Sequence, residues 1–268
     1  MKAATLIGII VACVGMAVGA TMEGSQVMAV LNPSAMLIVL GGTAGATLAS
    51  VGMDGFKAIM PLYKKTMSAE PFDLVGRVKE LVGYAEQARR DGLLSLDEAL
   101  NEVEDPYIKK GLQLVVDGTD PELVAEVLES ENEAMRQRHT LGRAAFEKAG
   151  GYAPTMGIIG TVFGLIHVLK HLDAPETLGP SISSAFIATL IGVASANVIY
   201  LPVGSRLKAL SAEELHFRQM TLEGVLAIQA GDNPRVVEEK LMAYVPPAQR
   251  AAGAADGGAD AGAERAAA

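Results

Sequence analysis

Four long runs of the sequence contain no Asp, Glu, Lys or Arg, and they constrain the fold more than any other feature. They cover residues 3–22, 24–53, 149–169 and 177–205, and are 20, 30, 21 and 29 residues long. A helix needs about 20 predominantly apolar residues to cross the hydrocarbon of a bilayer. The runs therefore predict an all-α integral membrane protein with four transmembrane helices, and no strand pattern competes with this reading.

The segment between the second and third runs has the opposite character. Residues 54–148 hold 13 Lys or Arg and 19 Asp or Glu, so this segment should lie in water. Apolar spacing predicts an amphipathic helix over residues 73–90, and the Ser95 to Glu98 tetrapeptide has the spacing of a capping box that would begin a second helix. The segment is thus a large helical domain.

Asx-Pro pairs mark further helix starts, because proline is favoured at the first helical position and Asn or Asp at the cap before it. Asn32-Pro33 begins the second span, and Asp120-Pro121 begins a third loop helix that can continue as a stalk into the third span. The fourth span can likewise continue past Pro202 to about residue 230. Asn233-Pro234 then starts a last short helix.

These signals divide the chain into five segments. They are transmembrane helices 1 and 2 (residues 1–53), a cytoplasmic helical domain (54–149), transmembrane helices 3 and 4 (150–203), cytoplasmic C-terminal helices (204–245) and a disordered Ala/Gly tail (246–268).

The distribution of Lys and Arg predicts the orientation of the spans. Residues 22–32 contain neither, and residues 170–176 contain only Lys170, whereas residues 52–149 contain 13. Basic residues are retained on the cytoplasmic side, so both termini and the large loop should be cytoplasmic.

Lys2 followed by an apolar run also resembles a cleavable signal peptide. The length of that run, and the hairpin it forms with the second, favour a retained span.

Several functional classes are disfavoured. The net charge of −9, with 22 basic and 31 acidic residues and no separate basic stripe, argues against nucleic-acid binding. Cys13 is the sole cysteine, and there is no Walker loop, dinucleotide fingerprint or cysteine pair for a metal. Serines near the fourth span and His167 raise the possibility of an intramembrane protease, but no serine has a glycine-flanked nucleophile elbow. We therefore expect no enzyme activity, no cofactor and no metal site.

Two threonines stand at comparable depth in the last two spans. Thr161 is the thirteenth residue of the 21-residue third run, and Thr189 is the thirteenth residue of the 29-residue fourth run. Their hydroxyls could line a polar path, or each could bond back to its own helix. Ion relays through membranes usually need an ionisable carboxylate, and none of the four runs contains one. If this chain conducts ions, a partner supplies the acid.

Glycine pairs spaced by four residues occur in three spans, at Gly15 and Gly19, Gly41 and Gly45, and Gly160 and Gly164. Such pairs allow close helix approach in lipid. The partner helix could belong to the same chain or to another subunit.

The order of spans, the large loop and several stretches resemble the A subunit of the bacterial flagellar motor stator, of the MotA/PomA type. The stretches are Ala-Arg-Arg-Asp-Gly-Leu-Leu-Ser-Leu-Asp-Glu at 88–98, Pro-Thr-Met-Gly-Ile-Ile-Gly-Thr-Val-Phe-Gly-Leu from 154, Ala-Phe-Ile-Ala-Thr-Leu-Ile-Gly from 185, and Leu201-Pro202. The resemblance implies an ion-driven machine in the inner membrane. Several copies of this subunit would surround a dimer of a B subunit (MotB type), which carries the essential membrane aspartate and anchors to peptidoglycan, and the cytoplasmic loops would push the rotor protein FliG.

The resemblance also implies roles for individual residues. The rotor-contact residues fall on Arg89 or its neighbour Arg90, and on Asp97 with Glu98, although Asp97 replaces the usual glutamate. Acids in a first helical turn also stabilise the helix dipole, so a structural role for Asp97 and Glu98 stays open. The family's two functional prolines fall on Pro154 and Pro202, and its ion-path threonines fall on Thr161 and Thr189.

The coupling ion is expected to be the proton. Sodium-driven members typically have a second threonine at the position of Ala188, and this chain has only Thr189 there. Two alternatives to the stator function stay open. One is an ExbB/TolQ-type energy-transducing subunit, which has only three spans but shares the motifs found here in the last two. The other is a passive membrane scaffold. The additional N-terminal hairpin favours the stator type.

Overall fold

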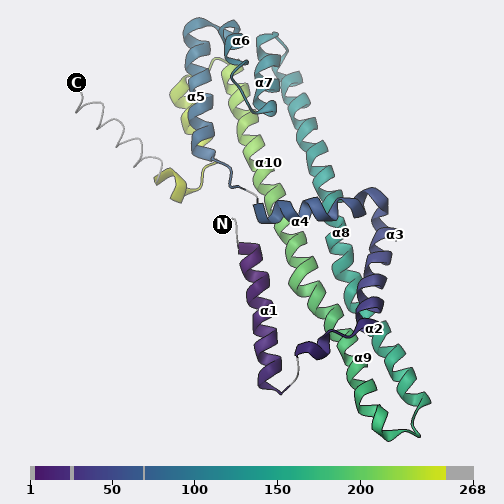
Figure 1. Ribbon diagram of the computed structural model, residues 1–268. Helices are drawn as coiled ribbons and strands as arrows, with labels where there is room; N and C mark the ends of the chain where they lie inside the picture. The colour runs from purple at the N-terminus through teal and green to yellow at the C-terminus, as the bar shows by residue number, and fades with distance from the viewer. Residues whose placement is uncertain (1–3, 25–26, 69, 252–268) are drawn as a thin grey trace. The chain divides into compact units, whose positions relative to one another are not determined.

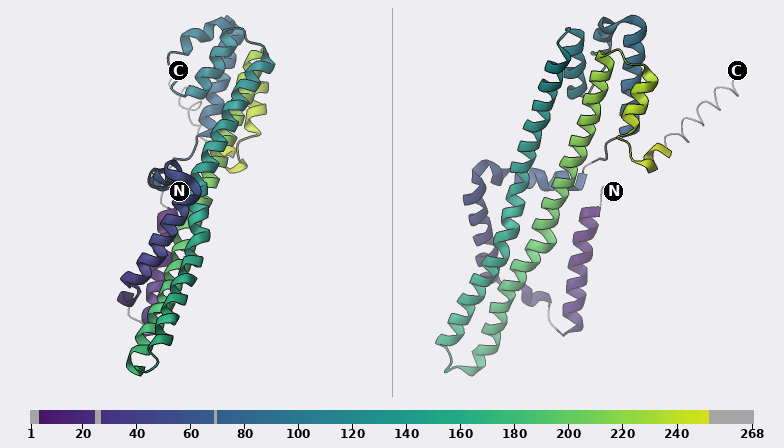
Figure 2. Two further views of the ribbon diagram at one scale, coloured as in Figure 1. Left: turned by 90° about the vertical axis from the view of Figure 1, so that its right-hand side faces the viewer. Right: turned by 180° about the vertical axis from the view of Figure 1, so that it is seen from behind.

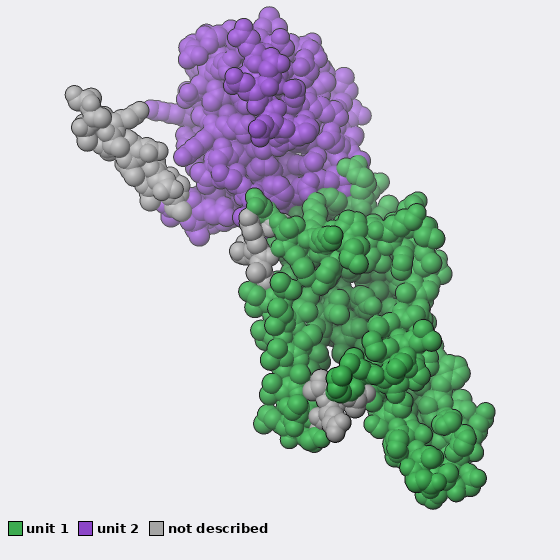
Figure 3. Space-filling view, viewed as in Figure 1, with its two compact units in different colours: residues 1–70, 137–211 green, residues 71–136, 212–268 purple. Residues whose placement is uncertain are grey.

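The computed structural model describes residues 4–24, 27–68 and 70–251, and within these ranges it contains only helices and the turns that join them (Figures 1 and 2). The chain divides into two compact units (Figure 3). Unit 1 comprises residues 1–70 and 137–211, and unit 2 comprises residues 71–136 and 212–268. The units are not the expected segments, because residues 54–70 and 137–149 belong to the same unit as the spans, and residues 212–245 belong to the same unit as residues 71–136.

Four helices of the described chain are long and apolar enough to cross a membrane, as the charge-free runs predict. They are Ala4–Met22, Pro33–Lys57, Pro121–Lys170 and Pro175–Gln229, of which the last two extend well beyond their apolar parts. The all-α class and the four-span count are confirmed, and the chain is a multi-pass membrane protein.

The second span begins at the predicted cap. The Asn32 side-chain oxygen accepts hydrogen bonds from the backbone N–H groups of Ser34 and Ala35, and Pro33 occupies the first helical position. The elements of this half of unit 1 are α1 (Ala4–Met22), the 3₁₀ turn η1 (Val27–Val30), α2 (Pro33–Met36), the π-helical turn η2 (Leu37–Gly41), α3 (Gly42–Lys57) and α4 (Ile59–Ser68).

The chain turns where the second charge-free run ends. Gly52 has φ of 71°, a conformation that glycine adopts without a Cβ penalty, and it kinks α3. Helix α4 then runs across α8 and α10 instead of along them (Figures 1 and 2). Its residues Ile59, Leu62 and Tyr63 pack against a small core of Phe146, Val203 and Leu207.

The last two spans are parts of long helices. Helix α8 (Pro121–Lys170) is continuous over 50 residues, so the predicted stalk into the third span is confirmed. Helix α9 (Pro175–Ser195) passes through the π-helical turn η4 (Ala196–Tyr200) into α10 (Leu201–Gln229). The continuation of the fourth span to about residue 230 is therefore also confirmed.

Unit 2 is a helical bundle around one apolar core. In addition to its parts of α8 and α10, it contains α5 (Leu74–Asp91), the 3₁₀ turn η3 (Leu93–Ser95), α6 (Leu96–Ala99), α7 (Pro106–Val116) and α11 (Pro234–Met242). Leu81, Leu112, Leu128, Met220 and Ile228 are among its fully buried side chains. The predicted helices over residues 73–90 and after Asn233 are present, and Asp73 and Asn233 each cap one of them.

A buried polar pair ties α7 to α8 within this core. Asn132 Nδ2 donates a hydrogen bond to the hydroxyl of Tyr107 at 2.8 Å, and the guanidinium of Arg218 lies 4.8 Å from the centre of the Tyr107 ring. Burial raises the pKa of Tyr107 to about 12. The phenol therefore stays neutral and hydrogen-bonded throughout the physiological pH range.

Three local features differ from expectation. The capping box at Ser95 is wrong: Ser95 already has helical φ and ψ in η3, so its hydroxyl donates to Gly92 O at 2.7 Å instead of capping α6. Helix α7 was not among the expected elements, although Asp105-Pro106 is an Asx-Pro start like the others. Residues 247–251 are helical, and residues 252–268 of the expected tail lie outside the described residues.

Candidate functional site

Helices α8 and α9 approach each other closely through small residues. A Cβ atom placed on Gly160 would lie 2.7 Å from Ala188 Cβ, and one on Gly164 would lie 2.5 Å from Ala185 Cβ. Each distance is shorter than real Cβ contacts allow, so only glycine fits. We call this contact the α8–α9 seam, and it consists of Gly157, Gly160, Gly164, Ala185, Ala188 and Gly192.

The seam brings the two predicted threonines together. The hydroxyls of Thr161 and Thr189 are hydrogen-bonded to each other. Thr161 Oγ1 also lies 3.1 Å from both Gly157 O and Ala185 O, and Thr189 Oγ1 lies 3.4 Å from Gly157 O. Thr161 thus bonds back to its own helix and also across the seam, whereas Thr189 bonds across it. Nothing in the sequence indicates that both hydroxyls lie within hydrogen-bond distance of the Gly157 carbonyl oxygen.

Ala188 precedes Thr189 in the sequence, but its side chain packs against the second span. Its side chain is 2% exposed and packs with Ala35 and Val39 of the second span, next to Gly160. A methyl group at this position therefore has a packing role in the seam.

The glycine pairs of the first two spans differ from the pair in the seam. A Cβ on Gly15, Gly19 or Gly45 would meet nothing within 4 Å. Of the three glycine pairs, the one at Gly160 and Gly164 packs within the chain.

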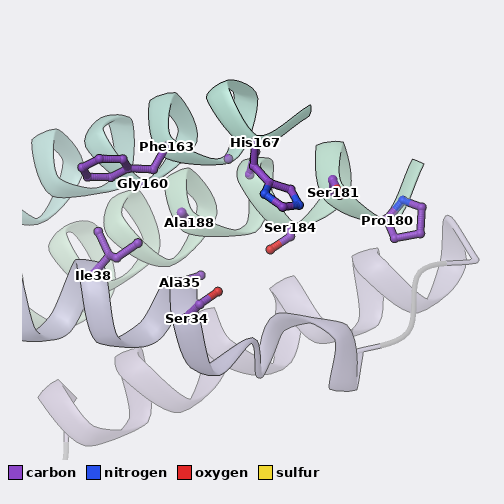
Figure 4. Close-up of a pocket in the computed structure, with 12 residues that line it drawn as sticks. Ser34, Ala35, Ile38, Gly160, Phe163, His167, Pro180, Ser181, Ser184 and Ala188 are labelled. Carbon is purple, nitrogen blue, oxygen red and sulfur yellow. The ribbon is translucent and has the colours of Figure 1, made fainter. Parts of the chain in front are cut away.

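A cavity of about 400 Å³ borders the seam between the second span and helices α8 and α9 (Figure 4). Small and apolar residues line it where it meets Gly160 and Ala188, and hydroxyl groups and one imidazole line the rest. Asn32 Nδ2 donates to Ser184 Oγ at 2.6 Å and so ties the start of α2 to α9. The polar lining residues are Ser34, His167, Ser181 and Ser184.

The second span carries further hydroxyl groups. Ser50 Oγ and the hydroxyl of Tyr152 lie 2.6 Å apart and link α3 to α8. Thr43 and Thr47 are each 1% exposed, and their Oγ1 atoms have no hydrogen-bond partner within the described part of the chain. Among the described residues, the polar contacts named above between the spans are made by hydroxyl, carbonyl and amide groups, without ionised side chains.

The two prolines lie in helices that pack against each other. A Cβ on Gly150, one turn before Pro154, would lie 2.5 Å from Leu201 Cδ2, and Leu201 directly precedes Pro202. Pro154 lies inside α8 and leaves the carbonyl four residues before it without its helical donor. Pro202 follows the π-helical turn η4, which is a common local accommodation of an interrupted helix. Both helices therefore have weakened backbone hydrogen bonding near one level of unit 1.

The predicted rotor-contact residues lie on consecutive elements of unit 2. Arg89 and Arg90 end α5, and Asp97 and Glu98 form the first turn of α6; all four are exposed. Leu96 is fully buried and fixes α6 to the core. We call these four residues the charged cluster.

The structure distinguishes Arg89 from Arg90 by their hydrogen-bond partners, a difference that the sequence does not show. Arg90 Nε and Asp91 Oδ2 lie 2.9 Å apart, and this hydrogen bond raises the pKa of Arg90 further. Arg89 has no carboxylate partner among the residues that the structure describes. Leu94 lies in the turn between the two charged pairs and is 75% exposed, so it is a further contact candidate that charge patterns alone do not reveal.

These features define what the arrangement can do chemically. Apart from His167, the charge-free runs contain no side chain that ordinarily carries a charge near neutral pH. The hydroxyl pair can therefore accept and donate hydrogen bonds but cannot hold a proton as a separate charge. No group of three or more His, Cys, Asp or Glu side chains suited to a metal ion occurs in the described ranges. The seam is suited to assist ion transfer when an acid is brought to it.

Comparisons with known proteins agree with this picture. A profile of the MotA/TolQ/ExbB proton channel family matches residues 99–220. Motility protein A of Bacillus subtilis (strain 168) is 38% identical over 256 residues, which are 93% of each chain, and the chemotaxis protein PomA of Vibrio alginolyticus is 34% identical over 94% of this chain and 98% of its own. The structure of the flagellar MotAB stator complex from Bacillus subtilis superimposes with a TM-score of 0.86 at 37% identity, covering 91% of this chain and 97% of that one.

The similarity to the motility proteins extends over the N-terminal hairpin as well as the last two spans, which separates this chain from a three-span arrangement. The chain therefore belongs to the motility protein A group of the MotA/TolQ/ExbB proton channel family.

Proposed function

We propose that this chain is the ion-conducting, torque-generating A subunit of a bacterial flagellar stator. The observation that carries the proposal is the hydroxyl pair of Thr161 and Thr189, which is held at the α8–α9 seam within charge-free runs that contain no carboxylate. A B-type partner would bring its membrane aspartate to this pair. The similarity to a flagellar MotAB stator complex supports that partner and an oligomeric assembly.

The proposed mechanism divides the work between the two units. Protonation of the partner's aspartate changes its charge, and therefore its attraction to the hydroxyls and carbonyls of the seam. Pro154 and Pro202 lie where helices α8 and α10 have lost backbone hydrogen bonds, so small rearrangements cost least there. The charged cluster in unit 2 would transmit the movement to FliG. The chain itself would carry no cofactor and perform no covalent chemistry.

In the proposed orientation, both termini and unit 2 are in the cytoplasm of a bacterial inner membrane. The support is the excess of Lys and Arg in the large loop over the two short links. In a Cys13→Ala background, a cysteine introduced at Thr177 should react with a membrane-impermeant maleimide added to whole cells, and a cysteine at Lys109 should react only after lysis. Labelling of Lys109→Cys in intact cells would contradict this orientation.

The hydroxyl pair should be needed for rotation but not for folding. Hydrogen bonds between membrane helices contribute on average about 0.6 kcal/mol, so Thr161→Val and Thr189→Val should accumulate at wild-type levels. Their swimming speed should nevertheless fall to near zero, because the path loses its hydroxyls. Thr161→Ser and Thr189→Ser keep the hydroxyl and should retain motility. Full motility of the valine variants would exclude the pair from the ion path.

The charged cluster should act on the rotor through its charge. Arg89 is exposed, so Arg89→Glu should change the free energy of unfolding by less than about 0.5 kcal/mol and leave membrane levels intact. Torque measured on tethered cells should fall, and a compensating charge reversal on the rotor protein should restore part of it. Lys79→Glu is the matched control, because it makes the same charge change on the exposed side of the same helix. Equal losses of torque in both variants would show that the effect comes from the overall charge of the unit and not from a specific contact at Arg89.

The coupling ion is proposed to be the proton. A sodium ion needs several oxygen ligands to replace its hydration shell, whereas a proton needs a carboxylate and a hydrogen-bonded chain. The seam offers one hydroxyl from each helix, and Ala188, which precedes Thr189 in the sequence, adds none. Swimming should persist when potassium replaces sodium at constant pH, and it should stop with a protonophore. Arrest on sodium removal alone would show sodium coupling.

A further inference from the structure

Basic residues outnumber acidic residues around α4, although the protein as a whole is acidic. The chain as a whole has a net charge of −9. The parts of unit 1 next to the charge-free runs are residues 54–70, 137–148 and 204–211, and together they hold eight basic and three acidic residues. The remainder of the chain is therefore strongly acidic, whereas the region around α4 has a net positive charge.

Helix α4 has one packed side and one exposed side. Ile59, Leu62 and Tyr63 face α8 and α10, and Leu62 fits against Gly142, where a Cβ would lie 2.9 Å from its Cδ1. Met60 and Lys64 of α4 are exposed, with Met60 at 63%, and so is Lys57, which ends α3 three residues before Met60. In the described part of the chain neither lysine has a carboxylate within ion-pair distance. The exposed side thus presents two unpaired ammonium groups around an apolar methionine.

The position of this side along the chain suggests what covers it. The second charge-free run ends at residue 53, so Lys57 follows it by about 6 Å of helix, a distance that places it among lipid headgroups. After the kink at Gly52, helix α4, which contains Lys64, runs across α8 and α10 instead of along them and so stays near the same level (Figure 1). Basic amphipathic helices in such a position are attracted to anionic lipids.

We propose that Lys57 and Lys64 bind the phosphate groups of anionic phospholipids, with Met60 inserted among the acyl chains between them. The surface is defined by these three residues. The retention of basic residues on one side of the membrane accounts for the sign of the charge in this region, but it does not require two lysines on one exposed side without acidic partners. An anionic lipid layer supplies the missing negative charge. This proposal does not depend on the stator function or on which ion is coupled.

The test uses a tryptophan at the centre of the surface. The chain contains no Trp, so Met60→Trp creates a local reporter in the full-length protein, purified with its B-type partner; the same complex without the substitution gives the background. The complex is reconstituted in mixed phosphatidylcholine and phosphatidylglycerol vesicles in which one or the other lipid carries brominated acyl chains. Quenching by the brominated phosphatidylglycerol should exceed that by phosphatidylcholine by at least about fivefold, the ratio that corresponds to about 1 kcal/mol from only one of the two lysines.

Three variants in the reporter background separate a charge interaction from a structural effect. Lys57→Gln/Lys64→Gln should reduce the ratio of the two quenching constants to near one, and Lys57→Arg/Lys64→Arg should preserve it. Lys79→Gln/Lys109→Gln, which removes two exposed lysines from unit 2, should leave it unchanged. Equal quenching by both lipids in the parent, or a ratio that survives the Gln variant, would overturn the proposal. Weak quenching by both lipids would also overturn it, because it would show that protein covers α4.

Discussion

The close packing of α8 against α9 is the interaction on which the rest of the proposed machinery depends. Lipid provides no hydrophobic drive for helix association, so contact relies on shape, and the glycines and alanines of the seam supply it. Larger residues at Gly160 or Gly164 would force the helices apart by more than a side chain can relax. The hydroxyls of Thr161 and Thr189 would then no longer meet. A packing requirement thus also creates the polar pair.

Much of the fold is readable from the sequence because its signals are local. Charge-free runs predict the spans, and caps such as Asn32 begin helices where expected. The capping box at Ser95 failed because a preceding turn had already placed that residue in helical geometry. The crossing course of α4 could not be predicted, since it depends on the kink at Gly52 and on packing against residues distant in sequence.

The candidate site was likewise only partly predictable, because some of its features depend on contacts between residues that are distant in the sequence. Sequence placed Thr161 and Thr189 at similar depth, but which carbonyls they share follows from the register of two helices, which one chain's residue pattern does not specify. The charges of Arg89 and Arg90 are identical in sequence, and only their surroundings distinguish them: Arg90 is bound to Asp91. Exposure of Leu94 likewise depends on how the turn is packed.

The central claim is that this chain drives flagellar rotation without a membrane carboxylate of its own. The most direct measurement is the rotation of tethered cells that lack the gene and carry it again on a plasmid. We predict flagellated cells that do not rotate without the gene, and rotation restored by the wild-type chain only when the partner's membrane aspartate is intact. Rotation in cells that lack the gene, or restored rotation with that aspartate replaced by asparagine, would contradict the claim.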